Sequence, residues 1–162
     1  MARQYSMPYM FPPLALLEPK ADAAGRTSTN WVSLRNAQKG WLVFYVNQGN
    51  AATILVTPLQ ATSYTGTGSK ALTNNVPIWL CDAATTADAF TTVTAAANYT
   101  TDANVAIKIV IFEITPEIAL DMANGFNHIG VSTGSSNAAN ITSAMFIPWN
   151  STQAATPPTT IV

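Results

Sequence analysis

The stretch Val105-Ala-Ile-Lys-Ile-Val-Ile-Phe-Glu-Ile114 decides the fold, because branched apolar residues continue along it without a helix-like spacing. Successive side chains of an extended chain point to opposite faces of a sheet. One face would carry Val105, Ile107, Ile109 and Ile111, and the other Ala106, Lys108, Val110, Phe112 and Ile114. The stretch therefore predicts a long β-strand.

A second strong strand is predicted at Trp41-Leu-Val-Phe-Tyr-Val46, where both alternating faces are apolar. Such a pattern is typical of a strand that is covered on both sides. A turn-like segment, Asn47-Gln-Gly-Asn50, leads to a further strand at Thr53-Ile-Leu-Val-Thr57. The short connection predicts that these two strands form a hairpin. Pro58 should then end the pairing or lie at an edge, since it has no N–H to donate.

The rest of the pattern predicts an all-β fold with one short helix. A helix is expected where Thr115 can cap, Pro116 occupies the first position and Gly125 closes the end. Loops are expected at Gly66-Thr-Gly-Ser-Lys70 and at 83–88. The remaining strands are predicted at 61–65, 76–82, 90–94, 126–132 and 141–147. About eight short strands indicate a single β-sandwich or jelly-roll-like domain.

The termini are predicted to be extended arms around this domain. We expect residues 1–29 to form an apolar, proline-rich arm and a polar linker, 30–150 the sandwich, and 151–162 a tail. The prolines are too dense for a helix or a central strand, yet many side chains of the segment are apolar. This combination suggests burial in the groove of a partner chain or against a neighbouring subunit. The alternative is a strand or an arm that folds back on its own domain. The residues expected to bind the partner are Tyr5, Tyr9, Met10, Phe11, Leu14, Leu16 and Leu17.

The composition excludes several classes of protein. Only 9% of residues are charged, and the formal net charge is -1. A nucleic-acid partner is not expected, because phosphate binding needs clustered Lys and Arg. A membrane span is not expected either, because no run of about 20 apolar residues occurs. A surface with so few charges repels its own copies poorly, so we expect partners to cover much of it.

Candidate catalytic and metal-binding residues are few. The single cysteine, Cys81, excludes an internal disulfide and is expected to be a buried small hydrophobe. The single histidine, His128, has no accompanying nucleophile signature and is expected to be structural. Two pairs of acidic residues, Asp82 with Asp88 and Glu113 with Glu117, are weak candidates for metal binding and acid–base chemistry respectively. The sequence therefore predicts no enzyme, no metal and no cofactor.

Four sequence blocks resemble those of small proteins encoded among the head genes of tailed bacteriophages. They are Asn30-Trp-Val-Ser-Leu-Arg-Asn36, Val46-Asn-Gln-Gly-Asn-Ala-Ala-Thr53, Gly66-Thr-Gly-Ser-Lys70 and Ser135-Ser-Asn-Ala-Ala-Asn-Ile-Thr142. The chain is thus similar to phage capsid decoration (cement) proteins over about residues 30–158. This resemblance implies an all-β protein on the outer surface of the virion, made in the cytoplasm of the bacterial host. It also implies binding to the major capsid protein and to its own copies, as a trimer at threefold positions.

Two further functions remain open from the sequence. Trp31, Trp41, Trp79 and Trp149 could form a sugar-stacking platform on a virion-displayed, glycan-binding β-sandwich. That hypothesis predicts an exposed cluster of two or more tryptophans. Another phage part, such as a tail-tube or head-completion protein, would show sixfold or twelvefold ring symmetry instead of threefold.

Overall fold

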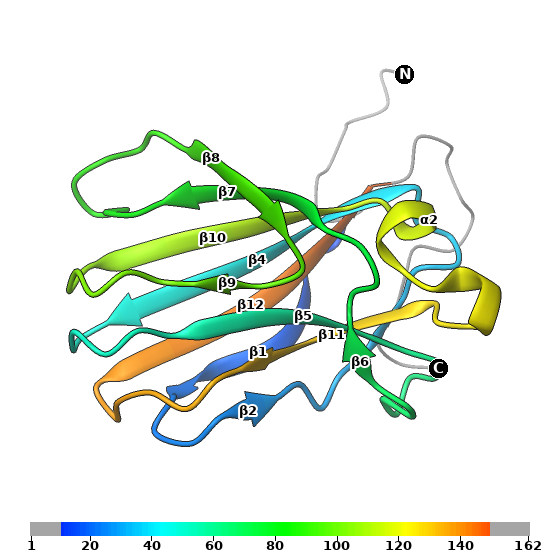
Figure 1. The fold of residues 1–162 in the computed structure, drawn as a ribbon, viewed down its shortest axis with the longest axis horizontal. Coiled ribbons are helices and arrows are strands. Elements are labelled where there is room, and N and C mark those ends of the chain that lie inside the picture. The colour runs from blue at the N-terminus through cyan, green and yellow to red at the C-terminus, as the bar shows by residue number, and fades with distance from the viewer. Residues whose placement is uncertain (1–10, 150–162) are drawn as a thin grey trace, which may run out of the picture.

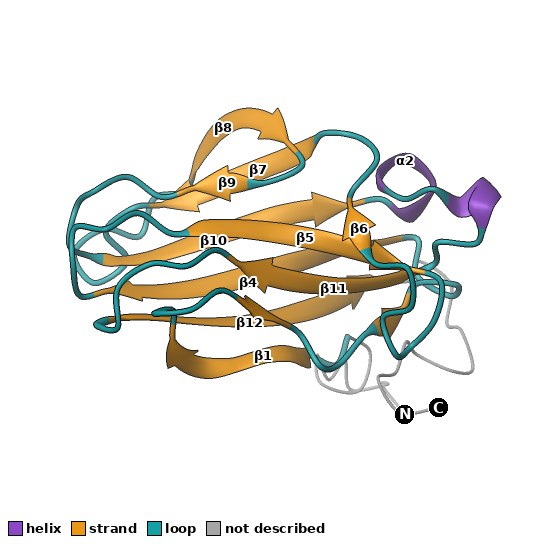
Figure 2. Cartoon of the chain, turned by 60° about the horizontal axis from the view of Figure 1, so that its bottom comes forward, coloured by secondary structure: helices purple, strands orange, loops and turns teal. Residues whose placement is uncertain are grey.

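The computed structural model describes residues 11–149, which form two antiparallel sheets packed face to face (Figures 1 and 2). Sheet A has the order β1-β12-β4-β10-β7-β8, and sheet B contains β2-β11-β5-β6 with β3 and β9 paired at its sides. The strands of sheet A are β1 (Leu14–Ala21), β4 (Lys39–Gln48), β7 (Val76–Cys81), β8 (Thr91–Ala96), β10 (Ile107–Ile114) and β12 (Asn140–Trp149). Those of sheet B are β2 (Arg26–Thr27), β3 (Val32–Ser33), β5 (Leu55–Ala61), β6 (Lys70–Ala71), β9 (Tyr99–Thr100) and β11 (His128–Thr133). The predicted all-β sandwich is confirmed.

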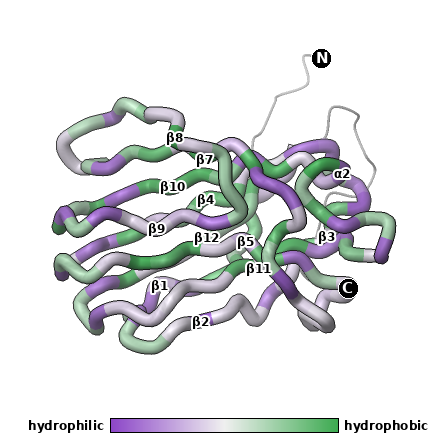
Figure 3. Tube along the Cα trace, viewed as in Figure 1, coloured by the Kyte–Doolittle hydropathy of each residue, from purple (hydrophilic) through white to green (hydrophobic). Residues whose placement is uncertain are grey.

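The core lies between the sheets and follows the alternation of the strands. Leu42, Phe44 and Val46 of β4 are fully buried, and their neighbours on β10 are Phe112, Val110 and Lys108. The rings of Phe44 and Phe112 meet edge to face with centroids 5.8 Å apart. In Figure 3, hydrophilic residues gather mainly in the loops at the ends of the strands. One face of each central strand therefore forms the core, as its period of two requires.

The predicted hairpin between 41–46 and 53–57 is wrong. β4 pairs with β10 and β12 in sheet A, whereas β5 pairs with β11 in sheet B. The segment around Asn47–Asn50 therefore carries the chain from one sheet to the other. β5 also continues through Pro58, which lies opposite Val131 on the β11 side. On the other side of β5, Pro58 lies in the gap between the residues that pair with β9 and those that pair with β6. The sequence 62–69, part of which was predicted as strand, is a turn region instead.

The predicted boundary of the N-terminal arm is also wrong. Residues 14–21 form β1, which pairs with β12 along the edge of sheet A. Leu16 and Leu17 are 2% and 8% exposed and belong to the hydrophobic core. The sandwich therefore begins at Leu14, because this segment contributes both backbone pairing and core side chains.

The expected polar linker at 21–29 is held in place by a buried ion pair. Asp22 is fully buried and accepts hydrogen bonds from Arg26 at 3.0 Å and from the hydroxyl of Thr133 at 2.9 Å. Arg26 also donates to the backbone oxygen of Thr142 at 2.6 Å. Burying a charge is costly unless it is paired and fully hydrogen-bonded. These contacts satisfy both charges and fasten the segment to β11 and β12.

The predicted helix region divides into two short pieces. α2 spans Pro116–Ala119, and the 3₁₀ helix η1 spans Met122–Asn124. Pro116 occupies the first turn as expected, although Thr115 makes no side-chain cap. Gly125 ends the region with φ of 81°, a left-handed conformation that favours glycine. Neither helical segment between residues 11 and 149 has the length and apolar character needed to span a membrane.

Candidate binding surface

The outer face of sheet A is apolar although no described part of the chain covers most of it. We define this outer face by the side chains of β4, β7, β10 and β12 that point away from the core. Several are large and well exposed, including Tyr45 at 43%, Trp149 at 41% and Met145 at 39%. An antiparallel sheet with one solvated face normally carries polar residues there. The members are Trp41, Val43, Tyr45, Trp79, Ile107, Ile109, Ile111, Ile141, Met145, Ile147 and Trp149.

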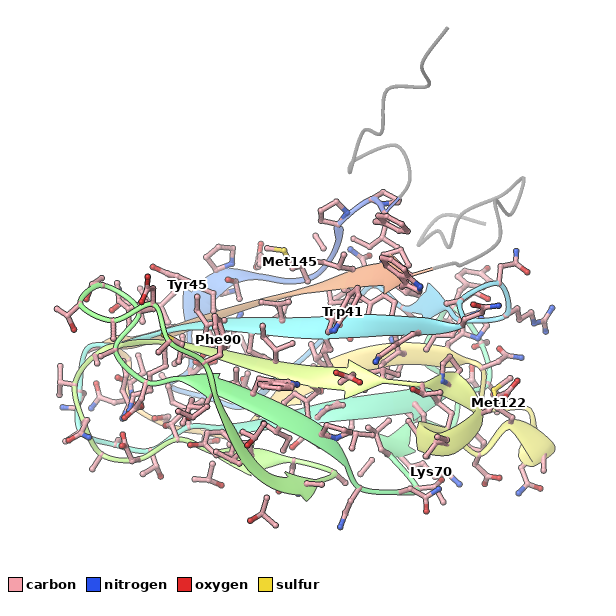
Figure 4. The ribbon with its side chains drawn as sticks, turned by 90° about the horizontal axis from the view of Figure 1, so that it is seen from above. Trp41, Tyr45, Lys70, Phe90, Met122 and Met145 are labelled. Carbon is pink, nitrogen blue, oxygen red and sulfur yellow. The ribbon has the colours of Figure 1, made fainter. Side chains whose placement is uncertain are left out.

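The pairing register makes this outer face continuous across four strands. Val43 of β4 lies beside Ile111 of β10 and Met145 of β12. Ile111 in turn lies beside Trp79 of β7. Figure 4 shows Tyr45 and Met145 on the same side of the sandwich, with Lys70 on the opposite side. Contiguous exposed apolar patches of this kind mark interaction sites.

An aromatic cluster stands at one end of the outer face. Phe11 stacks on Trp149 with ring centroids 4.8 Å apart and planes 7° from parallel. Trp41 meets Trp149 edge to face at 5.9 Å. These rings come from three separate segments of the chain, since Phe11 precedes β1, Trp41 lies on β4 and Trp149 ends β12. The cluster therefore joins the start of the described chain to the exposed face of sheet A.

The charges on the outer face cancel each other. At its aromatic end Lys39 of β4 forms an ion pair with Glu113 of β10. Glu113 lies beside Trp41, and Lys39 lies beside Trp149 in the strand register. The other outward positions of β4, β10 and β12 hold no charged residue. A nearly neutral, apolar face of this kind suits protein contacts that lose little strength in salt.

The outer face of sheet B differs, because the chain covers part of it with Trp31. This side chain is only 3% exposed. A Cβ atom added to Gly130 of β11 would lie 2.6 Å from Trp31 Cε3, and one added to Gly66 would lie 2.5 Å from Trp31 Nε1. Two glycines therefore make room for the indole. Gly66 also has φ of +77°, so a side chain there would be strained as well as crowded.

A buried lysine organises one end of the sandwich. Lys108 of β10 is fully buried and pairs with Asp82 at 3.2 Å and with Asp102. The hydrogen bond from Lys108 holds the pKa of Asp102 below its usual value. Burial, followed by the charges of Asp82 and Asp102, raises the pKa of Tyr99. Because both carboxylates reach solvent while the ammonium is enclosed, this cluster has the character of a structural ion-pair network.

The two candidate reactive side chains lie in structural settings. Cys81 is buried, and its thiol donates to the backbone oxygen of Ala87 at 3.3 Å, so the prediction for this residue is confirmed. His128 lies on β11 and is 8% exposed, and burial followed by the charge of Arg35 lowers its pKa. Among residues 11–149, no group of three or more His, Cys, Asp and Glu side chains is placed to hold a metal ion.

The residues predicted to bind a partner have different places in the structure. Tyr5, Tyr9 and Met10 lie outside the described residues. Phe11 joins the aromatic cluster, and Leu14 packs partly buried against the core. The prediction is wrong for Leu16 and Leu17, because they are core residues of this chain.

The sequence does not single out this outer face as a site. Its signal is the stretch Trp41-Leu-Val-Phe-Tyr-Val46, where both faces are apolar, because such a pattern predicts a strand covered on both sides without saying what covers it.

No family model, curated protein or solved structure matches the chain.

Proposed function

We propose that this chain is a non-enzymatic structural protein of a bacteriophage head, which binds the outer surface of the major capsid protein shell and stabilises it. The observation that carries the proposal is the continuous apolar outer face of sheet A, with its single neutralised ion pair. A face of this composition is costly to leave in water and gains free energy when a protein surface covers it. The resemblance of the four sequence blocks to phage head proteins supports the choice of the major capsid protein as the partner.

Many copies of the protein would bind the same shell, so the individual contacts add up. Each copy needs only a modest interface, because many identical contacts act together on one large assembly. The exposed aromatic residues Tyr45, Trp79 and Trp149 are the expected anchors. Buried anchors of this type typically contribute about 2 kcal/mol or more each.

The decisive experiment measures co-sedimentation of the chain with expanded shells of the phage that encodes it. The variant Tyr45→Ser with Met145→Ser removes two side chains from the outer face. Its matched control, Tyr64→Ser with Met122→Ser, removes the same residue types at 52% and 39% exposure from other parts of the surface. We expect the first variant to lose at least about 30-fold in affinity, which corresponds to one anchor of about 2 kcal/mol. Equal binding by both variants would contradict the proposal.

The oligomeric state is a second part of the proposal. We expect a trimer of 17.2 kDa chains, because a threefold oligomer matches threefold positions of a shell. Light scattering gives the native mass directly. A sixfold or twelvefold ring would favour a tail-tube or head-completion protein instead. A truncation that tests the N-terminal arm should remove residues 1–10 only, because removing residues 1–20 would also delete most of β1 and its core leucines.

Glycan binding is a second candidate, favoured by the aromatic cluster. Trp41 and Trp149 lie in contact, and the Lys39–Glu113 ion pair beside them offers polar groups to sugar hydroxyls. However, Phe11 already occupies one face of the Trp149 ring. Titration with a panel of bacterial surface glycans, using Trp149→Ala as the control, tests this function. Sugar binding that Trp149→Ala abolishes, together with intact shell binding by Tyr45→Ser, would favour the glycan role.

A further inference from the structure

The N-terminal end of the described chain lies on the outer face of sheet A. Phe11 is stacked on Trp149, and Trp149 contacts Trp41. The described chain therefore begins at the aromatic end of this face.

The sequence before Phe11 has the pattern of a one-sided extended segment. Tyr5, Met7, Tyr9 and Phe11 alternate with Gln4, Ser6, Pro8 and Met10. In an extended chain the odd-numbered side chains point to one side and the even-numbered ones to the other. The side that Phe11 presents to Trp149 would thus also present Tyr9, Met7 and Tyr5. The opposite side would carry mostly polar or backbone-restricting residues.

The length of this segment matches the face. Ten extended residues reach about 33 Å. The outer face runs about 20 Å along β4 from Trp41 to Asn47, at about 3.3 Å per residue. Across the strands it spans about 14 Å from β12 to β7, at about 4.8 Å per strand. The segment can therefore run from the aromatic cluster to the far end of the face without leaving its own subunit.

We propose that in the unassembled protein residues 1–10 lie along the outer face of their own sheet A, with Tyr5, Met7 and Tyr9 packed on it. The occupant is the same chain because Phe11 already holds the segment at the face. A tethered segment acts at a high effective concentration, which a second free copy reaches only when the protein is concentrated. Assembly on a shell would replace this cover by the partner. The proposal concerns the free protein and stands whether or not the partner is a capsid protein.

Two equally exposed methionines allow a test within one molecule of whether residues 1–10 pack on the outer face of sheet A. Met145 on the outer face and Met122 in η1 are each 39% exposed. Oxidation of methionine by hydrogen peroxide follows exposure. We expect Met145 of the full chain to oxidise severalfold more slowly than Met122, and to reach the rate of Met122 when residues 1–10 are removed. The truncation leaves β1 intact, and circular dichroism checks that the sandwich remains folded. Equal rates in the full chain would overturn the proposal.

The alternation gives a matched pair of variants. Met7→Ser removes an apolar side chain from the side that faces the sheet, whereas Met10→Ser removes the same side chain from the opposite side. Met7→Ser should speed the oxidation of Met145, and Met10→Ser should leave it unchanged. Equal effects of the two variants would contradict the one-sided packing.

A cross-linking experiment identifies the occupant. A photoreactive phenylalanine analogue in place of Tyr5 is activated in a mixture of unlabelled and ¹⁵N-labelled chains, and the peptides are mapped by mass spectrometry. We expect cross-links to β4, β10 or β12 within chains of one label. Cross-links that join the two labels would overturn the proposal in favour of exchange between copies. Absence of any cross-link to these strands would overturn it as well.

Discussion

The outer faces of the two sheets differ in the exposure of their tryptophans. On sheet B, Trp31 is buried against Gly130 and Gly66, so its indole belongs to the interior of the chain. On sheet A, Trp149 is 41% exposed, although it stands on a strand whose other face is core. The difference depends on what covers each face. On sheet B a residue of the chain's own loop is buried, whereas the aromatic end of sheet A carries Phe11 stacked on a Trp149 that stays exposed.

The largest effect is expected when the two tryptophans are removed in turn. Trp31→Ala should lower the free energy of unfolding by about 3–5 kcal/mol, because it empties a buried site of large volume. Trp149→Ala should lower it by about 1 kcal/mol, mainly through the lost ring stack with Phe11. Urea denaturation measures both values. Similar losses in the two variants would remove the distinction between the covered and uncovered faces.

A smaller effect is expected from crowding the covered face. In Gly130→Ala the new Cβ would meet Ser28 Oγ and Trp31 Cε3, each at 2.6 Å. Overpacking of this kind should cost about 2 kcal/mol of unfolding free energy. The same substitution in a Trp31→Ala background should cost much less, because part of the obstruction is gone. Additive effects in this double-mutant cycle would mean that the indole does not limit the space at Gly130.

Changes to the uncovered face should affect association more than stability. Tyr45→Ser with Met145→Ser should change the unfolding free energy by about 1 kcal/mol or less, since both side chains are largely exposed in the folded chain. In protein that lacks residues 1–10, this variant should bind less of a hydrophobic dye than the control Tyr64→Ser with Met122→Ser. An equal fall in dye binding for the two variants would show that the outer face of sheet A has no special apolar character.

The smallest expected effect is on the pH dependence of the free energy of unfolding, through His128 of sheet B. Burial, followed by the charge of Arg35, lowers the pKa of His128 in the folded chain. The folded state therefore disfavours the proton, and stability is lost as the pH falls through the unfolded pKa of about 6.5 towards the lower folded value. Stability curves of the wild type and of His128→Gln should diverge in this window. Parallel curves would show that His128 titrates alike in both states. Asp102 and Asp121, whose pKa values are also lowered by hydrogen bonds from lysines, act at more acidic pH.

Much of the local structure was predictable because it depends on neighbours in the sequence. The alternation at 105–114 gave a strand, and Pro116 and Gly125 marked the limits of the helical region. The buried place of Cys81 followed from its apolar surroundings. The Lys108 network was not predicted, since Asp82 and Asp102 reach this lysine only through the packing of separate loops.

By itself, the sequence determined that β4 and β10 are strands with two apolar faces, because a period of two depends only on backbone geometry. The tertiary structure decided which face became core, and it placed β4 and β5 in different sheets. It also made Leu14–Ala21 a strand of the sandwich instead of an arm. These outcomes depend on pairings between residues far apart in the chain, such as Leu14 with Phe146. The alternation of apolar residues along a strand shows which side chains share a face, but not which part of the protein packs on that face. The exposure of the outer face of sheet A is therefore visible only in the folded molecule.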